Sequence, residues 1–421
     1  MSVEVAVEQA HRRCWGSVLA STARLLGDLD LAQEVSQDAF VAALETWGVR
    51  GVPDNPDAWL TTTARRRALD LLRRQATLRR KLPLLVADLD DDAGAGQRIE
   101  PEEGGAVRDE LLRLVFACCH PALSRDAQVS LTLRLVCGVP TREVAAALLV
   151  PEPTVAARIT RAKKKITAAA IPYRVPRDAD LPVRLDAVLG VVYLAFTLGH
   201  TAPGGERVDD AALVERAVHL ARALVELMPD EPEARGLLGL VLLTHARRGA
   251  RVDGQGRLVL LEQQDRSRWD AAMVADGLAW TRSAMAPRPG RFALQAAVAA
   301  CHAAAPTWQD TPWREVVRLH DLLLEAWPSP VVRLNRAAAL SYADGPAPAL
   351  AEVDAVAGDQ RLAGYHYLPA ARAELLHRLG RHDEAADELG RAIALCRNAS
   401  ELDHLTRRLA TVRQGAVGPP R

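Results

Sequence analysis

The stretch TREVAAALLVPEPTVAARITRAKKKI, residues 141–166, carries the strongest local signal in this chain. Thr141 can cap a helix whose first turn holds the acidic residue Glu143. Pro151 and Pro153 break that helix, and a second helix is expected to begin there because proline is tolerated in a first turn. Apolar side chains recur along the second helix at spacings of four, three and four, which predicts one buried stripe. That stripe consists of Val155, Ile159, Ala162 and Ile166.

The opposite face of the second helix is polar and basic, with Thr154, Arg158, Arg161 and Lys165. Two short helices with a tight break and a basic outer face predict a helix-turn-helix, whose second helix enters the major groove of DNA. The alternative interpretation is an amphipathic helix pair with a solvated basic face.

A second basic helix is expected from Asp57 to about Arg80. Trp59 and Leu60 open it, with Ala64, Leu69 and Leu72 facing inward. Cationic side chains neutralise phosphates and aromatic rings replace lost base stacking, so this pattern suits a single DNA strand. For Trp59 alone, a place in the core is the favoured interpretation. The outer face carries Arg65, Arg66, Arg73 and Arg74.

Charge and composition agree with a helical protein that has a separate basic part. The chain has 53 basic and 53 acidic residues, but the basic ones gather at 65–81 and 158–165 while acidic ones gather at 88–103. Such asymmetry suggests a DNA-facing half and a neutral remainder. Ala, Leu and Arg dominate, and these residues favour helices over strands. At 421 residues the chain is expected to form two to four domains of an all-α protein.

Breaks in the helical pattern predict the domain boundaries. A charged, Gly-containing stretch reads as a flexible acidic linker, and Pro172, Pro176 and Pro182 mark a second boundary. The expected organisation is a helical bundle at 1–76, the linker at 77–106, the helix-turn-helix domain at 107–172 and a helical extension at 183–415.

The extension has the pattern of a helical repeat. Pro-containing turns separate amphipathic helices with Ala at packing positions, so that neighbouring pairs can stack closely. Residues 251–260 are the exception, where a Gly-rich turn between apolar runs predicts a small hairpin or extended loop. The expected helix pairs are 217–227 with 234–245 and 316–326 with 332–341, followed by a similar pattern at 379–392.

Several functional classes have no support in the sequence. The six cysteines form no CxxC pair and no zinc-type spacing, and His200, His302 and His366 are isolated. We therefore expect no enzyme, no metal and no cofactor. No apolar run approaches the ~20 residues that span a bilayer, and the N-terminus lacks a signal-peptide pattern. The expected protein is soluble and intracellular, with no membrane partner.

Three segments together resemble a known family. Asp28-Leu-Asp-Leu-Ala-Gln-Glu-Val-Ser-Gln-Asp-Ala-Phe40 is similar to the region 2 helix of sigma factors that grips the polymerase clamp. Trp59-Leu60 with the segment 64–74 looks like the helix that melts promoters and reads the minus-ten element. Thr141-Arg-Glu-Val-Ala, with 154–155 and 161–162, resembles region 4, the minus-thirty-five reader. The order and the short gap are typical of extracytoplasmic-function sigma factors, in particular of a subgroup with a tetratricopeptide-like C-terminal extension.

The resemblance implies a role for individual residues. For polymerase binding it implies Asp28, Leu31, Ala32, Glu34, Val35, Gln37, Asp38 and Phe40. For the minus-ten element it implies Asn55, Trp59, Arg65, Arg66, Arg67, Asp70, Arg73 and Arg74. For the minus-thirty-five element it implies Thr141, Arg142, Glu152, Thr154, Ala157, Arg158, Arg161, Lys164 and Lys165. The chain departs from the family at Arg66, where Asn is frequent, and in the turn, where Leu149, Pro151 and Pro153 replace the common residues.

The expected function is promoter selection for core RNA polymerase, with the clamp of the largest subunit and the flap of the second-largest as contact points. Because it is large and has no catalytic constellation, the extension is expected to regulate this activity, either directly or by binding a regulatory protein. Two alternatives stay open: a DNA-binding regulator that never joins polymerase, and a repeat scaffold whose basic helices are incidental.

Overall fold

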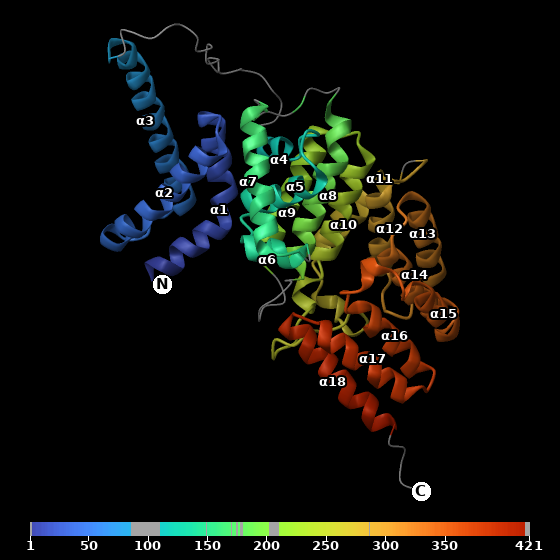
Figure 1. Cartoon of the computed structure of the whole chain (residues 1–421). Coiled ribbons are helices and arrows are strands. Elements are labelled where there is room, and N and C mark those ends of the chain that lie inside the picture. Colours follow the sequence, from blue (N-terminus) through green and yellow to red (C-terminus); the bar gives the residue numbers. More distant parts are fainter. Residues whose placement is uncertain are drawn as a thin grey trace. The chain divides into compact units, whose positions relative to one another are not determined.

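The computed structural model describes residues 2–85, 110–148, 150–169, 171–173, 176, 180–201, 210–285 and 287–416 (Figure 1). The chain divides into two compact units, Met1–Ala195 and Phe196–Arg421. Within the described ranges the regular structure is helical, and the one pairing of extended backbone is an antiparallel bridge between Val252 and Leu258. The predicted all-α class is confirmed.

The first unit opens with α1 (Val3–Leu26), α2 (Leu29–Arg50) and α3 (Pro56–Leu85). Gly27 ends α1 with a φ of 66°, a conformation that glycine adopts without strain. Asp28 then begins α2, because its carboxylate accepts hydrogen bonds from the N–H groups of Asp30 and Leu31. Helix α3 continues beyond residue 76, the expected end of the first domain. The expected linker falls outside the described residues from position 86 onward.

The same unit contains α4 (Glu110–Cys118), α5 (Arg125–Leu135), α6 (Thr141–Ala147) and α7 (Glu152–Ala168). The buried residues of α7 are Val155, Ile159, Ala162 and Ile166, which confirms the predicted stripe. Pro153 lies in its first turn, also as predicted. The predicted capping role of Thr141 is wrong. Extended Pro140 occupies the cap position without a side-chain hydrogen bond, so Thr141 is already the first helical residue of α6.

Helix α1 packs on α4, and Gly16 permits a close approach to Val136, the residue that follows α5. A Cβ atom at this position would lie 2.3 Å from the carbonyl oxygen of Val136 and 2.8 Å from Leu111 Cδ1. A side chain of any size would collide with that backbone. The three-helix segment α1–α3 is therefore fitted closely to the helix-turn-helix segment within the first unit.

Helix α8 (Leu181–His200) contains the boundary between the two units. It corrects the expectation that no segment approaches the length of a membrane span. Its 20 residues have a mean hydropathy of 1.7 over their most apolar stretch, enough by length and composition to cross a bilayer. More than half of that stretch is buried inside the protein, which is typical of a core helix.

The second unit is a succession of helices that pack mostly on their neighbours in chain order. Figure 1 shows the later ones following one another toward the C-terminus. The predicted helix pairs are confirmed, as is the hairpin-like turn at 251–260, where Gly256 has a φ of 77°. The α-helices are α9 (Ala211–Leu227), α10 (Pro232–His245), α11 (Ala271–Ala284), α12 (Arg291–Ala304), α13 (Trp313–Ala326), α14 (Pro330–Ala343), α15 (Pro346–Val356), α16 (Tyr367–Arg378), α17 (His382–Leu395) and α18 (Ala399–Ala416).

Candidate nucleic-acid interface

The outer face of α7 presents cations to solvent. Arg161, Lys164 and Lys165 are exposed and make no ion pair with any described residue. Arg161 holds its guanidinium near the helix by donating from Nε to the Ala157 carbonyl oxygen at 3.2 Å. Ala157 is exposed and Thr154 half-buried on the same face. This arrangement leaves three long cationic side chains available to phosphates or base edges.

Other residues predicted to read the minus-thirty-five element are engaged within the fold. Arg158 pairs with Asp126 of α5 at 2.8 Å, and its side chain is only 23% exposed. Glu152 stands exposed in the first turn of α7, where a carboxylate favours the positive end of the helix dipole. Arg142 is exposed and lies 3.8 Å from its neighbour Glu143, whereas Thr141 is half-buried. Arg158 could reach DNA only by leaving Asp126.

Lys163 interrupts the basic series of α7. Its Nζ lies 2.9 Å from Asp30 Oδ1 and 2.6 Å from Gln33 Oε1, both on α2, and the side chain is 12% exposed. Arg24 of α1 and Glu110 of α4 form a further ion pair, at 3.1 Å. The helix that would enter DNA is thus bonded, through one of its lysines, to the helix that would bind polymerase.

Helix α3 exposes a second set of cations, in which Arg65, Arg66 and Arg74 have no ion-pair partner among the described residues. Two further arginines of the predicted minus-ten site are paired. Arg67 lies 3.4 Å from Asp38, and Arg73 lies 3.0 Å from Asp70. Three exposed guanidinium groups on one helix form a basic face of the kind that neutralises phosphates.

The inner face of α3 differs from the prediction. Leu60, Ala64 and Ala68 are fully buried, whereas Leu69, expected to face inward, is 41% exposed. The buried residues follow each other at intervals of four, and Leu69 lies one position beyond that row, about 100° further around the helix. The row of short side chains allows α3 to lie close to α1 and α2.

Two residues of the predicted minus-ten site have structural roles. Asn55 caps α3, because its Oδ1 accepts a hydrogen bond from the Ala58 N–H at 3.0 Å. Trp59 is half-buried and packs edge to face against Trp47, with ring centroids 5.5 Å apart. The contact with Trp47 therefore supports the interpretation of Trp59 as a core residue.

On α2, the predicted polymerase contacts separate into core and surface. Ala32, Val35 and Phe40 are at most 6% exposed, so as long as α2 stays packed their side chains cannot meet a partner. Leu31 is half-buried and Asp28 is used as the cap, which leaves Glu34, Gln37 and Asp38 exposed. Sequence reasoning missed Val41 and Leu44, which are 52% and 44% exposed and continue the same face. Two apolar side chains on an otherwise polar face are the signal that could have identified them.

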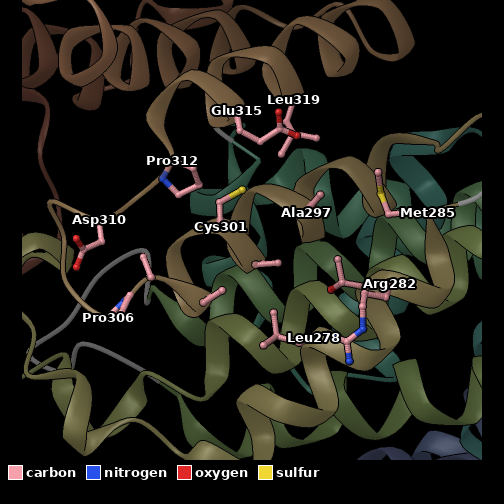
Figure 2. A pocket seen from close by; sticks show the side chains of 14 residues that line it. Leu278, Arg282, Met285, Ala297, Cys301, Pro306, Asp310, Pro312, Glu315 and Leu319 are labelled. Atoms are coloured by element: carbon pink, nitrogen blue, oxygen red, sulfur yellow. The ribbon is translucent and has the colours of Figure 1, made fainter.

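The second unit contains a groove of about 510 Å³ between α11, α12 and α13. Figure 2 shows its mainly apolar walls, with Cys301 and Ala297 of α12 between Leu278 of α11 and Leu319 of α13. The charged side chains along its walls are Arg282, Asp310 and Glu315. The groove is open to solvent along its length.

Both segments that carry the basic helices match known protein families. Residues 12–77 match Sigma-70 region 2, and residues 113–166 match Sigma-70, region 4. Residues 184–285 match a family of unknown function, DUF6596. An uncharacterised protein of Rhizobium meliloti strain 1021 is 42% identical over 420 residues, which cover 97% of each chain.

Proposed function

The chain belongs to the sigma-70 family and carries a C-terminal extension, and on this premise we propose that it directs core RNA polymerase to promoters as a sigma factor of the extracytoplasmic-function type. The observation that carries the proposal is the exposed row Arg161, Lys164 and Lys165 on the second helix of a helix-turn-helix that matches region 4. The short interval between the two matches, 78–112, supports the extracytoplasmic-function type.

At the upstream promoter element, α7 enters the major groove. Arg161 is the candidate for a base edge or a phosphate, since its fork of donors can bind a guanine bidentately. Lys164 and Lys165 bind phosphates and set the register of the helix on the duplex. Arg158 contributes after exchanging Asp126 for DNA, or keeps α7 on α5 throughout.

At the downstream element, the exposed arginines of α3 hold the separated non-template strand. Arg65, Arg66 and Arg74 neutralise its phosphates, and Trp59 supplies an aromatic edge where α3 begins. Arg66 replaces the frequent Asn of the family, so this position favours a phosphate contact over an amide hydrogen bond to a base.

The polymerase supplies the chemistry, and this chain supplies recognition in the cytoplasm. We place the clamp contact on the outer face of α2, at Glu34, Gln37, Asp38, Val41 and Leu44, because these side chains are exposed there. The region 4 segment would contact the flap of the second-largest subunit. No group of the chain takes part in bond making or breaking under this proposal.

The extension regulates promoter engagement. Its size and the apolar groove beside Cys301 support a regulatory ligand or protein as the input. To test this, in vitro transcription by the full chain is compared with transcription by a chain ending after His200. If the two chains transcribed equally well from the same promoters, the extension would have no regulatory role.

The experiment that tests the proposal is reconstitution of the full chain with core polymerase on a library of genomic promoters. We expect specific transcripts that require the chain, and co-purification with core enzyme that Val41→Glu weakens. Ser17→Glu, a substitution on the exposed surface of α1, serves as its control. If the chain bound promoter DNA but did not associate with core polymerase, it would instead be a DNA-binding regulator that never joins polymerase. Absence of both activities would favour a repeat scaffold.

A further inference from the structure

Three side chains with different metal-ligating groups converge at the end of the second unit. His366 precedes α16, Cys396 follows α17, and Glu401 lies in the first turn of α18. Their ligating atoms all lie within 4.8 Å of one another. The sequence interpretation of His366 as an isolated histidine is therefore wrong, because 30 residues of chain separate it from Cys396 and hide the convergence.

The nitrogen of His366 that faces this cluster lies against one oxygen of the Glu401 carboxylate. His366 Nε2 is buried and lies 3.2 Å from Glu401 Oε2, an ion-pair distance. The side chains of His366 and Glu401 are 17% and 14% exposed. An imidazole nitrogen and a carboxylate oxygen at this distance can hold a metal ion between them as well as a proton.

The surrounding residues hold the cluster in place. The Tyr367 hydroxyl donates to Glu401 Oε1 and leaves Oε2 directed at His366. Asn398, 4% exposed, accepts at Oδ1 from the N–H groups of Ser400 and Glu401 at 3.0 and 3.1 Å. These bonds fix the turn between Cys396 and Glu401. Supporting hydrogen bonds of this kind orient the ligands in metal sites.

The donor set decides which metal fits. A thiolate, an imidazole and a carboxylate together suit Zn²⁺, whereas Mg²⁺ and Ca²⁺ prefer oxygen ligands alone. In a tetrahedral zinc site the ligand atoms lie about 3.5 Å apart, so the His366–Glu401 pair already has the spacing. Since all three ligand atoms lie within 4.8 Å of one another, a shift of about 1 Å completes the site. The two anionic ligands also balance the charge of a divalent ion, which lowers the cost of burying it.

We propose that His366, Cys396 and Glu401 form a Zn²⁺ site that fastens α18 to α16 and α17. Zinc binds His366 at Nε2, Cys396 as the thiolate and Glu401 through Oε2, with solvent in the fourth position. The thiol proton of Cys396 and the proton on His366 Nε2 leave when the metal binds, and the imidazole keeps a proton on Nδ1.

The ionisation of the ligands is compatible with this site. Burial raises the pKa of Glu401, but its interactions with His366 and Tyr367 lower that pKa by more, so the carboxylate is charged at neutral pH. Burial raises the pKa of the Cys396 thiol, so the metal has to displace its proton. The simpler explanation of the cluster is an ion pair between His366 and Glu401 beside a Cys396 thiol that donates to the Asn398 carbonyl oxygen at 3.5 Å. It predicts that the chain binds no metal at this point.

The test uses the full chain, reduced and freed of metal with a chelator. Co²⁺ is titrated as the optical probe and is then displaced by Zn²⁺. We expect one equivalent of Co²⁺, with the near-ultraviolet absorption of a cobalt–thiolate bond, and displacement by one equivalent of Zn²⁺. Cys396→Ser should abolish the thiolate absorption and weaken Zn²⁺ binding by about 100-fold or more, because a ligand is lost rather than a supporting group.

Two further variants and one control separate ligation from folding. Glu401→Gln keeps the size of the side chain and should also weaken Zn²⁺ binding, while Tyr367→Phe should weaken it by about 10-fold, as loss of a supporting hydrogen bond does. Cys301→Ser, at a half-buried thiol of α12, should leave both metals bound as before. Circular dichroism of each metal-free variant checks that the helices persist. Thiolate absorption that survives Cys396→Ser, or Zn²⁺ binding that survives Glu401→Gln unchanged, would overturn the proposal.

Discussion

Neighbouring lysines of α7 are expected to differ in their contribution to promoter binding. Lys164 is exposed and makes no ion pair with a described residue, whereas Lys163 is 12% exposed and bonded to Asp30 and Gln33. Each neutralised phosphate adds about 0.9 to the slope of log K against log salt concentration, so one contact is worth about 8-fold in affinity for each tenfold dilution of salt. Lys164→Ala should therefore lower the slope by about 0.9. Lys163→Ala removes the same charge and should leave the slope unchanged.

The measurement is fluorescence anisotropy of a labelled promoter fragment with the full chain and core polymerase, repeated over a series of KCl concentrations. Lys164→Ala with Lys165→Ala should lower the slope by about 1.8, since two contacts are lost. An unchanged slope in that double variant would remove the outer face of α7 from the DNA interface. Equal slope losses for Lys163→Ala and Lys164→Ala would mean that the bond between α7 and α2 does not persist on DNA.

Three further predictions concern the stability of the fold. Gly16→Ala should lower the free energy of unfolding by about 1–3 kcal/mol in denaturant titrations, because its Cβ would lie 2.3 Å from a carbonyl oxygen; Gly48→Ala, with open space around it, should be neutral or stabilising. Glu233→Ala should cost about 1–2 kcal/mol, since its carboxylate accepts from two N–H groups at the start of α12 at 3.0 and 3.1 Å, and an equal loss for exposed Glu226→Ala would contradict this. Burial lowers the pKa of His302 to about 4, so between pH 6.5 and 4 the unfolded chain binds more protons than the folded chain, and the free energy of unfolding falls as the pH falls through that window. His302→Gln should make the free energy of unfolding depend less on pH there. An unchanged pH dependence in the variant would argue against a neutral, buried imidazole.

Local periodicity explains most of what could be predicted about the helices. The stripe Val155, Ile159, Ala162 and Ile166 was identifiable because side chains three or four positions apart share a helix face, whatever lies opposite. Pro151 and Pro153 predicted the break before α7 from the same kind of local signal, because proline ends a helix but is tolerated in the first turn of the next. Periodicity was less reliable where the inner face is made of small residues, so Leu69 was placed inside while Ala68 is buried.

Pairings between distant segments could not be predicted in this way. The partner of Arg158 is on α5, that of Lys163 is on α2, and the partners of His366 lie beyond α17. Each of these contacts changes the chemistry of a residue that the sequence presents simply as basic or isolated. On α2, burial of Ala32, Val35 and Phe40 depends likewise on packing against other helices.

The sequence by itself determined that this chain is helical, that its basic residues gather on two helices, and that those helices resemble the promoter-reading parts of a sigma factor. These properties depend on spacing and residue type along one segment. Only the tertiary structure decided which cations stay free of ion pairs, which face of α2 is exposed, and which thiol, imidazole and carboxylate meet. The reason is physical: an ion pair or a ligand cluster depends on separation in space, and a helical chain brings together residues whose distance in sequence carries no record of the contact.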